Sequence, residues 1–230
     1  MDFPFGRTVP IAHRGAHDES HPENSPAAFQ RALDLGFEGV ELDACNLADG
    51  SLVVRHDAWL ELSDERVAIP TLHPDDARVV AAGLQPLEPI LEVLAASNVL
   101  VVFDWKGFGY EDRAVRLLDD HGLTSRTIVS TSVEEALLRF KSLEPQLCTG
   151  LTAPGLSKRL PPAPVLPLLA RRWRCEAVML DQAFVSQAAV TAVREAGLGL
   201  FLWTAQTEED VARLRAYAPD GIMTDLAQAG

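Results

Sequence analysis

Short apolar runs alternate with stretches of helical periodicity along most of the chain. Eight short runs rich in β-branched and other apolar residues predict strands, and the segments between them repeat apolar residues three and four positions apart, which predicts amphipathic helices. Such alternation is typical of parallel strands joined by helical crossovers. The predicted strands span residues 9–12, 39–42, 99–103, 127–130, 148–151, 177–180, 198–203 and 221–223, and the predicted helices span 25–35, 87–96, 111–121, 133–143, 186–196 and 207–217.

Eight strands with helices between them close naturally into a (β/α)8 barrel, so the sequence predicts an α/β protein with the TIM-barrel fold. A doubly wound open sheet is the alternative architecture, because it has the same alternation. No linker, low-complexity tract or longer repeat divides the chain, and residues 1–230 are therefore predicted to form a single barrel domain.

Three segments depart from the alternation. Directly after the second predicted strand, a turn at 46–50 and a short strand at 51–56 predict a hairpin inserted beyond that strand. Residues 57–85 mix charge, proline and isolated apolar residues, and residues 153–167 are rich in proline. We predict both to be surface loops, the second around a degenerate crossover.

Composition narrows the classes of function. The chain has 230 residues, 47% of them hydrophobic, and a formal net charge of −13. This acidity disfavours binding to nucleic acid or to an anionic membrane, since both require a positive surface. There is no secretory signal, no apolar run long enough to span a bilayer, and no zinc-type spacing among the three cysteines. We therefore expect a cytoplasmic protein with reduced cysteines and no nucleic-acid partner, and the oligomeric state stays open.

Acidic residues stand at the ends of two predicted strands, and in a barrel such ends meet at one mouth. Glu41 and Asp43 are two residues apart and so point to the same face of their strand, and Asp104 follows another apolar run. Neighbouring carboxylates repel unless a cation lies between them, and oxygen ligands favour a hard ion such as Mg²⁺ or Ca²⁺. A solvated acidic pair, or a salt bridge from Asp104 to Lys106, is the structural alternative.

Basic and titratable residues are predicted at the same mouth. His13 and Arg14 end the first predicted strand, and His56 ends the hairpin strand. The two imidazoles can exchange protons near neutral pH, although they could equally ligate a metal. Arg14 and Lys106 carry the type of charge that binds phosphoryl oxygens. The other histidines lack a strand-end position and are interpreted as surface or loop residues, namely His17, His21, His73 and His121.

Glu23 precedes the first predicted helix, next to Asn24 and Ser25, which can cap that helix. Capping is the structural role of this stretch. Glu23 also follows the first strand closely enough to orient an active-site histidine or to reach a metal.

These residues, taken in order, resemble the glycerophosphodiester phosphodiesterase family. The resemblance covers nearly the whole chain and implies a metal-dependent (β/α)8 barrel that hydrolyses glycerophosphodiesters to glycerol 3-phosphate and an alcohol. The motifs that carry it are His-Arg-Gly at 13–15, Pro-Glu-Asn-Ser at 22–25, Glu-Leu-Asp at 41–43, His-Asp at 56–57, Gln-Pro-Leu-Glu at 85–88, Asp-Trp-Lys at 104–106, Leu-Trp-Thr at 202–204 and Asp-Gly-Ile-Met-Thr-Asp at 220–225.

The family resemblance also implies a divalent cation as cofactor, magnesium or calcium with manganese as a further option, and a small phosphodiester as substrate. Asp104 stands where the family usually has glutamate, which shortens that ligand by one methylene. For Trp203, a core position is the structural alternative. The implied roles are metal ligation by Glu41, Asp43 and Asp104, acid–base catalysis by His13 and His56, phosphate binding by Arg14 and Lys106, a metal-binding or orienting role for Glu23, and a substrate wall at Trp203.

Two other functions stay open at this point. A phospholipase D or sphingomyelinase D type of activity on lysolipids would use the same mouth, but the sequence shows no secretion signal and no disulfide framework. A barrel that binds ligands without catalysis is the other alternative, and the aspartate at position 104 favours it. The presence of both histidines, two further carboxylates and two cations argues against that loss of catalysis.

Overall fold

A closed ring of parallel strands forms the centre of the molecule. The computed structural model describes residues 1, 5–61, 65–153 and 161–227. Within these ranges β1 pairs with both β2 and β12, which closes the sheet, confirms the predicted TIM barrel and excludes the open sheet. The barrel strands are β1 (Val9–His13), β2 (Gly39–Asn46), β7 (Leu100–Trp105), β8 (Thr127–Thr131), β9 (Cys148–Ala153), β10 (Ala177–Asp181), β11 (Gly199–Ala205) and β12 (Gly221–Thr224).

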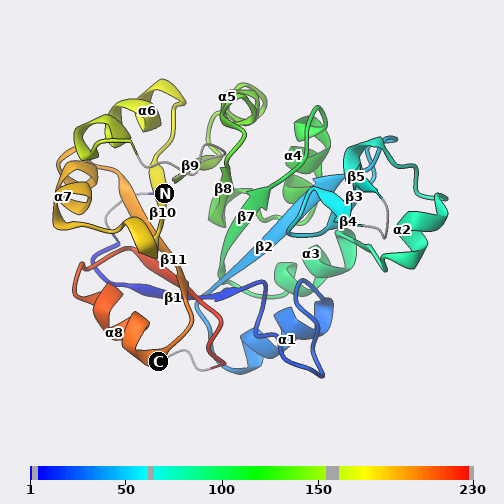
Figure 1. Ribbon diagram of the computed structural model, residues 1–230, viewed down its shortest axis with the longest axis horizontal. Helices are drawn as coiled ribbons and strands as arrows, with labels where there is room; N and C mark the ends of the chain where they lie inside the picture. The colour runs from blue at the N-terminus through cyan, green and yellow to red at the C-terminus, as the bar shows by residue number, and fades with distance from the viewer. Residues whose placement is uncertain (2–4, 62–64, 154–160, 228–230) are drawn as a thin grey trace.

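Helices lie around the outside of this ring (Figure 1). Helix α1 (Pro26–Asp34) begins after Ser25, whose hydroxyl accepts a hydrogen bond from the Ala28 N–H, and has proline in its first turn. Among the described helices, none combines the length and the apolar character that crossing a bilayer requires. Within the described ranges, six further helices surround the ring: α3 (Glu88–Ala95), α4 (Glu111–Asp120), α5 (Glu134–Leu143), α6 (Leu166–Arg172), α7 (Gln187–Glu195) and α8 (Glu208–Arg215).

The alternation of side chains along each strand separates two apolar layers. Phe103 packs in the layer between the strands and the helices, whereas Val102, Met179 and Phe201 pack together in a second cluster inside the ring. Asp104 follows Val102 by two residues and therefore points to the inner face, directly above this interior cluster. The packed interior thus forms the floor of the mouth at the carboxyl ends of the strands.

The predicted hairpin insertion is present. Strand β3 (Leu52–Val54) pairs antiparallel with the last residues of β2, with Ala44 opposite Val54 and Asn46 opposite Leu52. The short β6 (Gln85–Pro86) adds to the outer edge of β3. Strand β2 therefore continues beyond the barrel, and its extension forms the base of the insertion.

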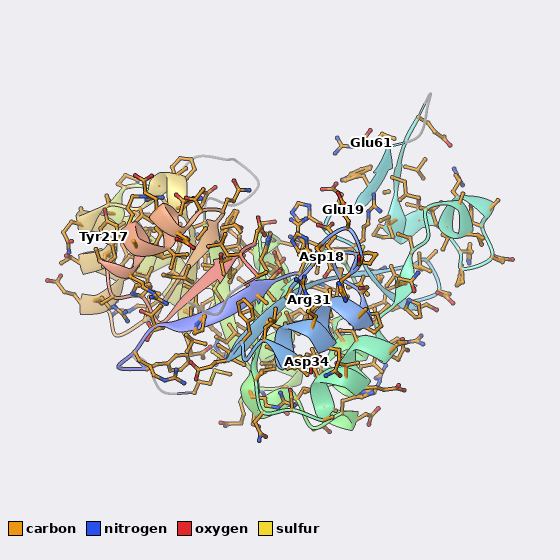
Figure 2. The ribbon with its side chains drawn as sticks, turned by 90° about the horizontal axis from the view of Figure 1, so that it is seen from below. Asp18, Glu19, Arg31, Asp34, Glu61 and Tyr217 are labelled. Atoms are coloured by element: carbon orange, nitrogen blue, oxygen red, sulfur yellow. The ribbon has the colours of Figure 1, made fainter. Side chains whose placement is uncertain are left out.

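The prediction of a loop over 57–85 is wrong. The described part of this segment holds the hairpin of β4 (Trp59–Glu61) and β5 (Arg66–Ala68), a 3₁₀ turn (Ile69–Thr71) and α2 (Ala77–Ala81), while 62–64 lie outside the described residues. The segment projects from the barrel beside β2, and Figure 2 shows Glu61 on its outer part. Its isolated apolar residues have no sequence period because they meet in a separate small core, made of Cys45, Leu47, Val53, Leu60, Ile69, Leu72 and Val79.

The structure adds detail to the prediction for 153–167. Residues 154–160 lie outside the described residues, but a 3₁₀ turn (Ala163–Val165) leads into α6, which completes the crossover between β9 and β10. Pro164 and Pro167 occupy the opening turns of these two elements, where no backbone N–H is needed. These two prolines therefore mark the starts of helical turns.

The three cysteines, Cys45, Cys148 and Cys175, are free and buried. Burial raises the pKa of each thiol to about 12. They are protonated core side chains, as expected from their spacing.

A buried ionic contact links the segment before β1 to the start of β11 and the end of α7. Asp220 is almost completely buried, and its carboxylate accepts hydrogen bonds from the N–H groups of Phe5 (2.6 Å) and Leu200 (2.8 Å). Arg194 on α7 pairs with the same carboxylate at 2.6 Å. Asp220 therefore ties the segment before β1 to β11 and α7.

We expect Asp220→Ala to lower the free energy of unfolding by about 3 kcal/mol, because two backbone donors and a guanidinium lose their shared acceptor. Urea unfolding followed by circular dichroism measures this loss. Asp119→Ala, at an exposed position on α4, is the matched control and should change the value by less than about 0.5 kcal/mol. A loss below about 1 kcal/mol for Asp220→Ala would contradict the role of this contact.

Candidate active site

Glu41, Asp43 and Asp104 converge at the mouth of the barrel. Asp43 lies directly opposite Asp104 in the register of β2 and β7, and Glu41 precedes Asp43 by two residues on the same face. One carboxylate oxygen of each residue lies within 4.8 Å of the others. Glu41 and Asp43 are buried and Asp104 is partly buried. The structure thus brings together the three acids that the sequence placed at strand ends.

Three carboxylates this close to one another cannot all be charged at low cost. Burial, and then the charge of Asp43, raise the pKa of Glu41 to about 8. The pKa of Asp43 is lowered, because the charges on Lys106 and other neighbouring cations outweigh the effect of burial. Without a cation between them, the acids therefore keep a proton on Glu41 near neutral pH.

The three acids fit a divalent cation. Their oxygens form the donor set that Mg²⁺, Ca²⁺ and Mn²⁺ prefer. Oδ1 of Asp104 is buried and has no hydrogen-bond partner among the described residues, so this oxygen is available to ligate a cation. The acidic group can therefore hold one divalent ion.

Asn24 fixes the orientation of Asp43, a role that the sequence analysis missed. The Asn24 side-chain amide donates a hydrogen bond to Asp43 Oδ2 (2.9 Å), and its Oδ1 accepts one from the Asp43 N–H (3.2 Å). Asn24 has a φ of 55°, a left-handed conformation that asparagine tolerates better than most residues. Ser25 caps α1, so Asn24 is free for this contact.

Arg14 and Lys106 both lie against the acidic group. Lys106 Nζ is 2.6 Å from Asp104 Oδ2 and 3.3 Å from Asp43 Oδ1. Arg14 Nε is 3.3 Å from Asp43 Oδ2, and its Nη1 is 2.9 Å from Glu23. Burial lowers the pKa of Lys106, but the adjacent carboxylates outweigh it and the net shift is upward. Both side chains therefore stay cationic beside the cavity.

Glu23 contacts Arg14 and lies outside the group formed by Glu41, Asp43 and Asp104. It is an exposed side chain. In this arrangement Glu23 orients the guanidinium of Arg14. The sequence analysis predicted that Glu23 would orient a histidine or contact a metal.

A sharp turn after β1 directs Arg14 back toward Asp43. Arg14 and Gly15 have φ values of 55° and 78°, and a Cβ on Gly15 would lie 2.8 Å from the backbone of Ala28. Glycine is therefore required at position 15. The loop that follows is fastened to α1, because Arg31 donates to the carbonyl of residue 16 (2.8 Å) and pairs with Asp18 (2.7 Å; Figure 2).

His13 and His56 both line the mouth. Nε2 of His13 is 3.9 Å from Glu41 Oε2, and its Nδ1 is 2.7 Å from Asp225 Oδ1. Burial lowers the pKa of His13, but Asp225 and Glu41 outweigh burial and leave it above its usual value. His56 is 44% exposed, and its Nδ1 is 2.9 Å from Asp57 Oδ1. In both residues Nδ1 is engaged by a carboxylate, which leaves Nε2 for a substrate.

Asp225 is a second residue that the sequence analysis missed as part of the site. It follows β12 directly, just as Arg14 follows β1 and Lys106 follows β7. A polar residue at this position could therefore have been predicted at the mouth from the sequence. His17 Nε2 lies 3.6 Å from the same carboxylate, so this loop histidine shares Asp225 with His13. Asp225 reaches His13 because the first and last strands are neighbours in the closed ring.

A cavity of about 540 Å³ opens above the barrel floor. Trp203 lines this cavity and also packs partly against the interior core. Besides the residues already described, the cavity is lined by Ser130, Ser132, Thr152, Met179, Asp181, Phe184, Trp203, Thr204 and Met223.

Comparison with solved structures gives the same fold. A glycerophosphodiester phosphodiesterase from Parabacteroides distasonis superposes with a TM-score of 0.78 at 21% identity, covering 96% of this chain and 94% of that one. A phosphodiesterase from Oleispira antarctica, solved with the product sn-glycerol-3-phosphate, superposes with a TM-score of 0.75 at 21% identity. The superposition covers 95% of this chain and 93% of that one. In sequence, a glycerophosphodiester phosphodiesterase from Caldanaerobacter subterraneus is 28% identical over 95% of this chain and 94% of the relative.

The barrel, its charged mouth and these relatives define an enzyme that hydrolyses phosphoric diesters. The model of the glycerophosphoryl diester phosphodiesterase family matches residues 13–83 and 96–229. The chain belongs to this family, as its motifs indicated.

Binding of Mn²⁺ should release a proton, because the cation replaces the proton that Glu41 holds below pH 8. We expect the affinity to rise from pH 6 to about 8 and then to level off. The same shift should make the metal-free protein less stable as pH rises from 4.5 toward 8, since its folded state then binds more protons than its unfolded state.

Titration calorimetry in buffers of different ionisation enthalpy measures the proton release. Glu41→Gln is the control, because it removes the titrating carboxyl and should abolish the release. An affinity that is constant from pH 6 to 8, with no proton released, would show that Glu41 holds no proton in the metal-free protein.

Proposed function

We propose that this protein hydrolyses glycerophosphodiesters to glycerol 3-phosphate and an alcohol, using a divalent cation and two histidines. The observation that carries the proposal is the convergence of three acids, two cations and two imidazoles on one cavity. The product complex of the Oleispira antarctica relative and the name of the Caldanaerobacter relative support the choice of substrate.

Arg14 and Lys106 bind the phosphoryl oxygens in this proposal. Both are held at the cavity by carboxylates, so their charges are already in place when the substrate arrives. A divalent cation bound at Glu41, Asp43 and Asp104 supplies further neutralisation of the phosphoryl charge. Fixed charges of this kind provide most of the acceleration in phosphoryl transfer.

The two histidines move the protons. His56 is the more exposed and accepts the proton of the glycerol 2-hydroxyl at Nε2, so that this oxygen attacks phosphorus. His13, whose pKa is raised through Asp225 and Glu41, donates a proton from Nε2 to the departing alcohol. Water then opens the cyclic phosphate with the two proton transfers reversed.

The proposal also covers the setting of the enzyme. Residues 1–230 act as one catalytic domain on a small phosphodiester in the cytoplasm, without a nucleic-acid partner. The net charge of −13 supports the last point. An activity assay distinguishes this hydrolysis from the two alternatives, the lysolipid activity and the non-catalytic barrel.

Purified protein is expected to release glycerol 3-phosphate from glycerophosphocholine, to lose this activity in EDTA and to regain it with Mg²⁺, Mn²⁺ or Ca²⁺. Product identity is measured by coupled assay and mass spectrometry. Release of choline from lysophosphatidylcholine alone would favour the lysolipid activity. No turnover of either substrate with any of the three ions would overturn the proposal.

His13→Ala and His56→Ala should each lower kcat by roughly 10²- to 10⁴-fold, which is the usual contribution of acid–base catalysis. Calorimetry should show Mn²⁺ binding within a few-fold of wild type in both variants. His73→Ala, at an exposed position away from the cavity lining, is the matched control. If both active-site variants kept more than about a tenth of the wild-type rate, the assigned roles would be wrong.

A further inference from the structure

The mouth cavity has two chemically different regions beyond the metal and phosphate residues. One side carries hydroxyl groups from Ser130, Ser132 and Thr152 at the ends of β8 and β9. The Thr152 hydroxyl is buried and has no hydrogen-bond partner among the described residues. A buried hydroxyl without a partner is costly, so this side suits a ligand that brings hydroxyl groups of its own, such as glycerol.

The adjoining wall, on β10 and β11, is aromatic and acidic. Asp181 and Trp203 lie opposite each other in the register of β10 and β11, on the face that also carries the interior residues Met179 and Phe201. Phe184, in the turn after β10, joins them in lining the cavity. An aromatic wall next to a carboxylate is the arrangement that binds a cation, through the ring faces and through charge.

The charge of Asp181 has no counterpart among the described residues. One of its oxygens accepts a hydrogen bond from the Ala183 N–H at 2.8 Å and so caps the short turn after β10. Arg14 and Lys106 are each held by other carboxylates, at 2.9 Å and 2.6 Å. Asp181 is partly buried in the cavity wall, where an unpaired carboxylate attracts a positive ligand more strongly than it would in bulk water.

We infer that the enzyme selects glycerophosphodiesters whose alcohol carries a positive charge, such as choline or ethanolamine, and that Asp181 with Trp203 and Phe184 forms the site for that cation. The inference depends on the proposed hydrolysis and adds a substrate preference to it. The glycerol half then occupies the hydroxyl side, and the cationic alcohol occupies the side of β10 and β11.

Asp181→Asn tests this assignment, because asparagine caps a turn as well as aspartate does but carries no charge. For glycerophosphocholine, kcat/KM should fall about fivefold to tenfold, mainly through KM. For glycerophosphoglycerol, whose alcohol is neutral, the same substitution should change kcat/KM by less than about twofold. In the wild-type enzyme, kcat/KM for glycerophosphoglycerol should be at least about fivefold lower than for glycerophosphocholine. Asp119→Asn on the exposed face of α4 is the control for a change in overall charge.

An equal loss for both substrates, or no preference in the wild-type enzyme, would overturn the inference while leaving the hydrolysis intact. The absence of turnover with every substrate would instead overturn the proposed function. A binding titration then tests the cation site independently of turnover. Choline, titrated in the presence of inorganic phosphate and Mn²⁺ and followed by tryptophan fluorescence, should bind wild type about fivefold more tightly than Asp181→Asn. Equal affinity, or no binding to wild type, would show that no cation site exists.

Discussion

Repulsion among three neighbouring carboxylates is the constraint on which the mouth of this barrel depends. The register of β2 and β7 places Asp43 opposite Asp104, and the two-residue spacing adds Glu41 on the same face. The surrounding groups offset this repulsion in different ways. Lys106 pairs with two of the acids, and Asn24 donates a hydrogen bond to one. The remaining imbalance raises the pKa of Glu41 to about 8, and a divalent cation bound here would relieve it.

The barrel makes such a site possible because its interior is packed below the mouth. Val102 and Phe201 lie in the interior cluster, and the residues two positions further along their strands, Asp104 and Trp203, reach the cavity. Rigid strands thus hold the three carboxylates, whereas Arg14 and Lys106 stand just past the ends of β1 and β7. Closure of the ring also places Asp225, which follows the last strand, next to His13 at the end of the first strand.

Much of this arrangement was predictable from the sequence. The alternation of apolar runs and helical patterns predicted the barrel, and the polar residues at the ends of predicted strands indicated which acids, histidines and cations lie at its mouth. Asn24 was misjudged because a polar residue before a helix usually caps it, and only the structure shows that Ser25 does so. The insertion over 57–85 was misjudged for another reason. Its apolar residues form a core through contacts between distant positions, and such contacts leave no local period.

The central claim is that Glu41, Asp43 and Asp104 hold one divalent cation. Crystals grown with Mn²⁺ and measured at the manganese absorption edge test it most directly. A single anomalous peak within coordination distance of all three carboxylates is the predicted result, with no such peak in crystals of Asp43→Asn. Strong peaks elsewhere in the barrel, or no peak at these residues in a fully ordered mouth, would contradict the account.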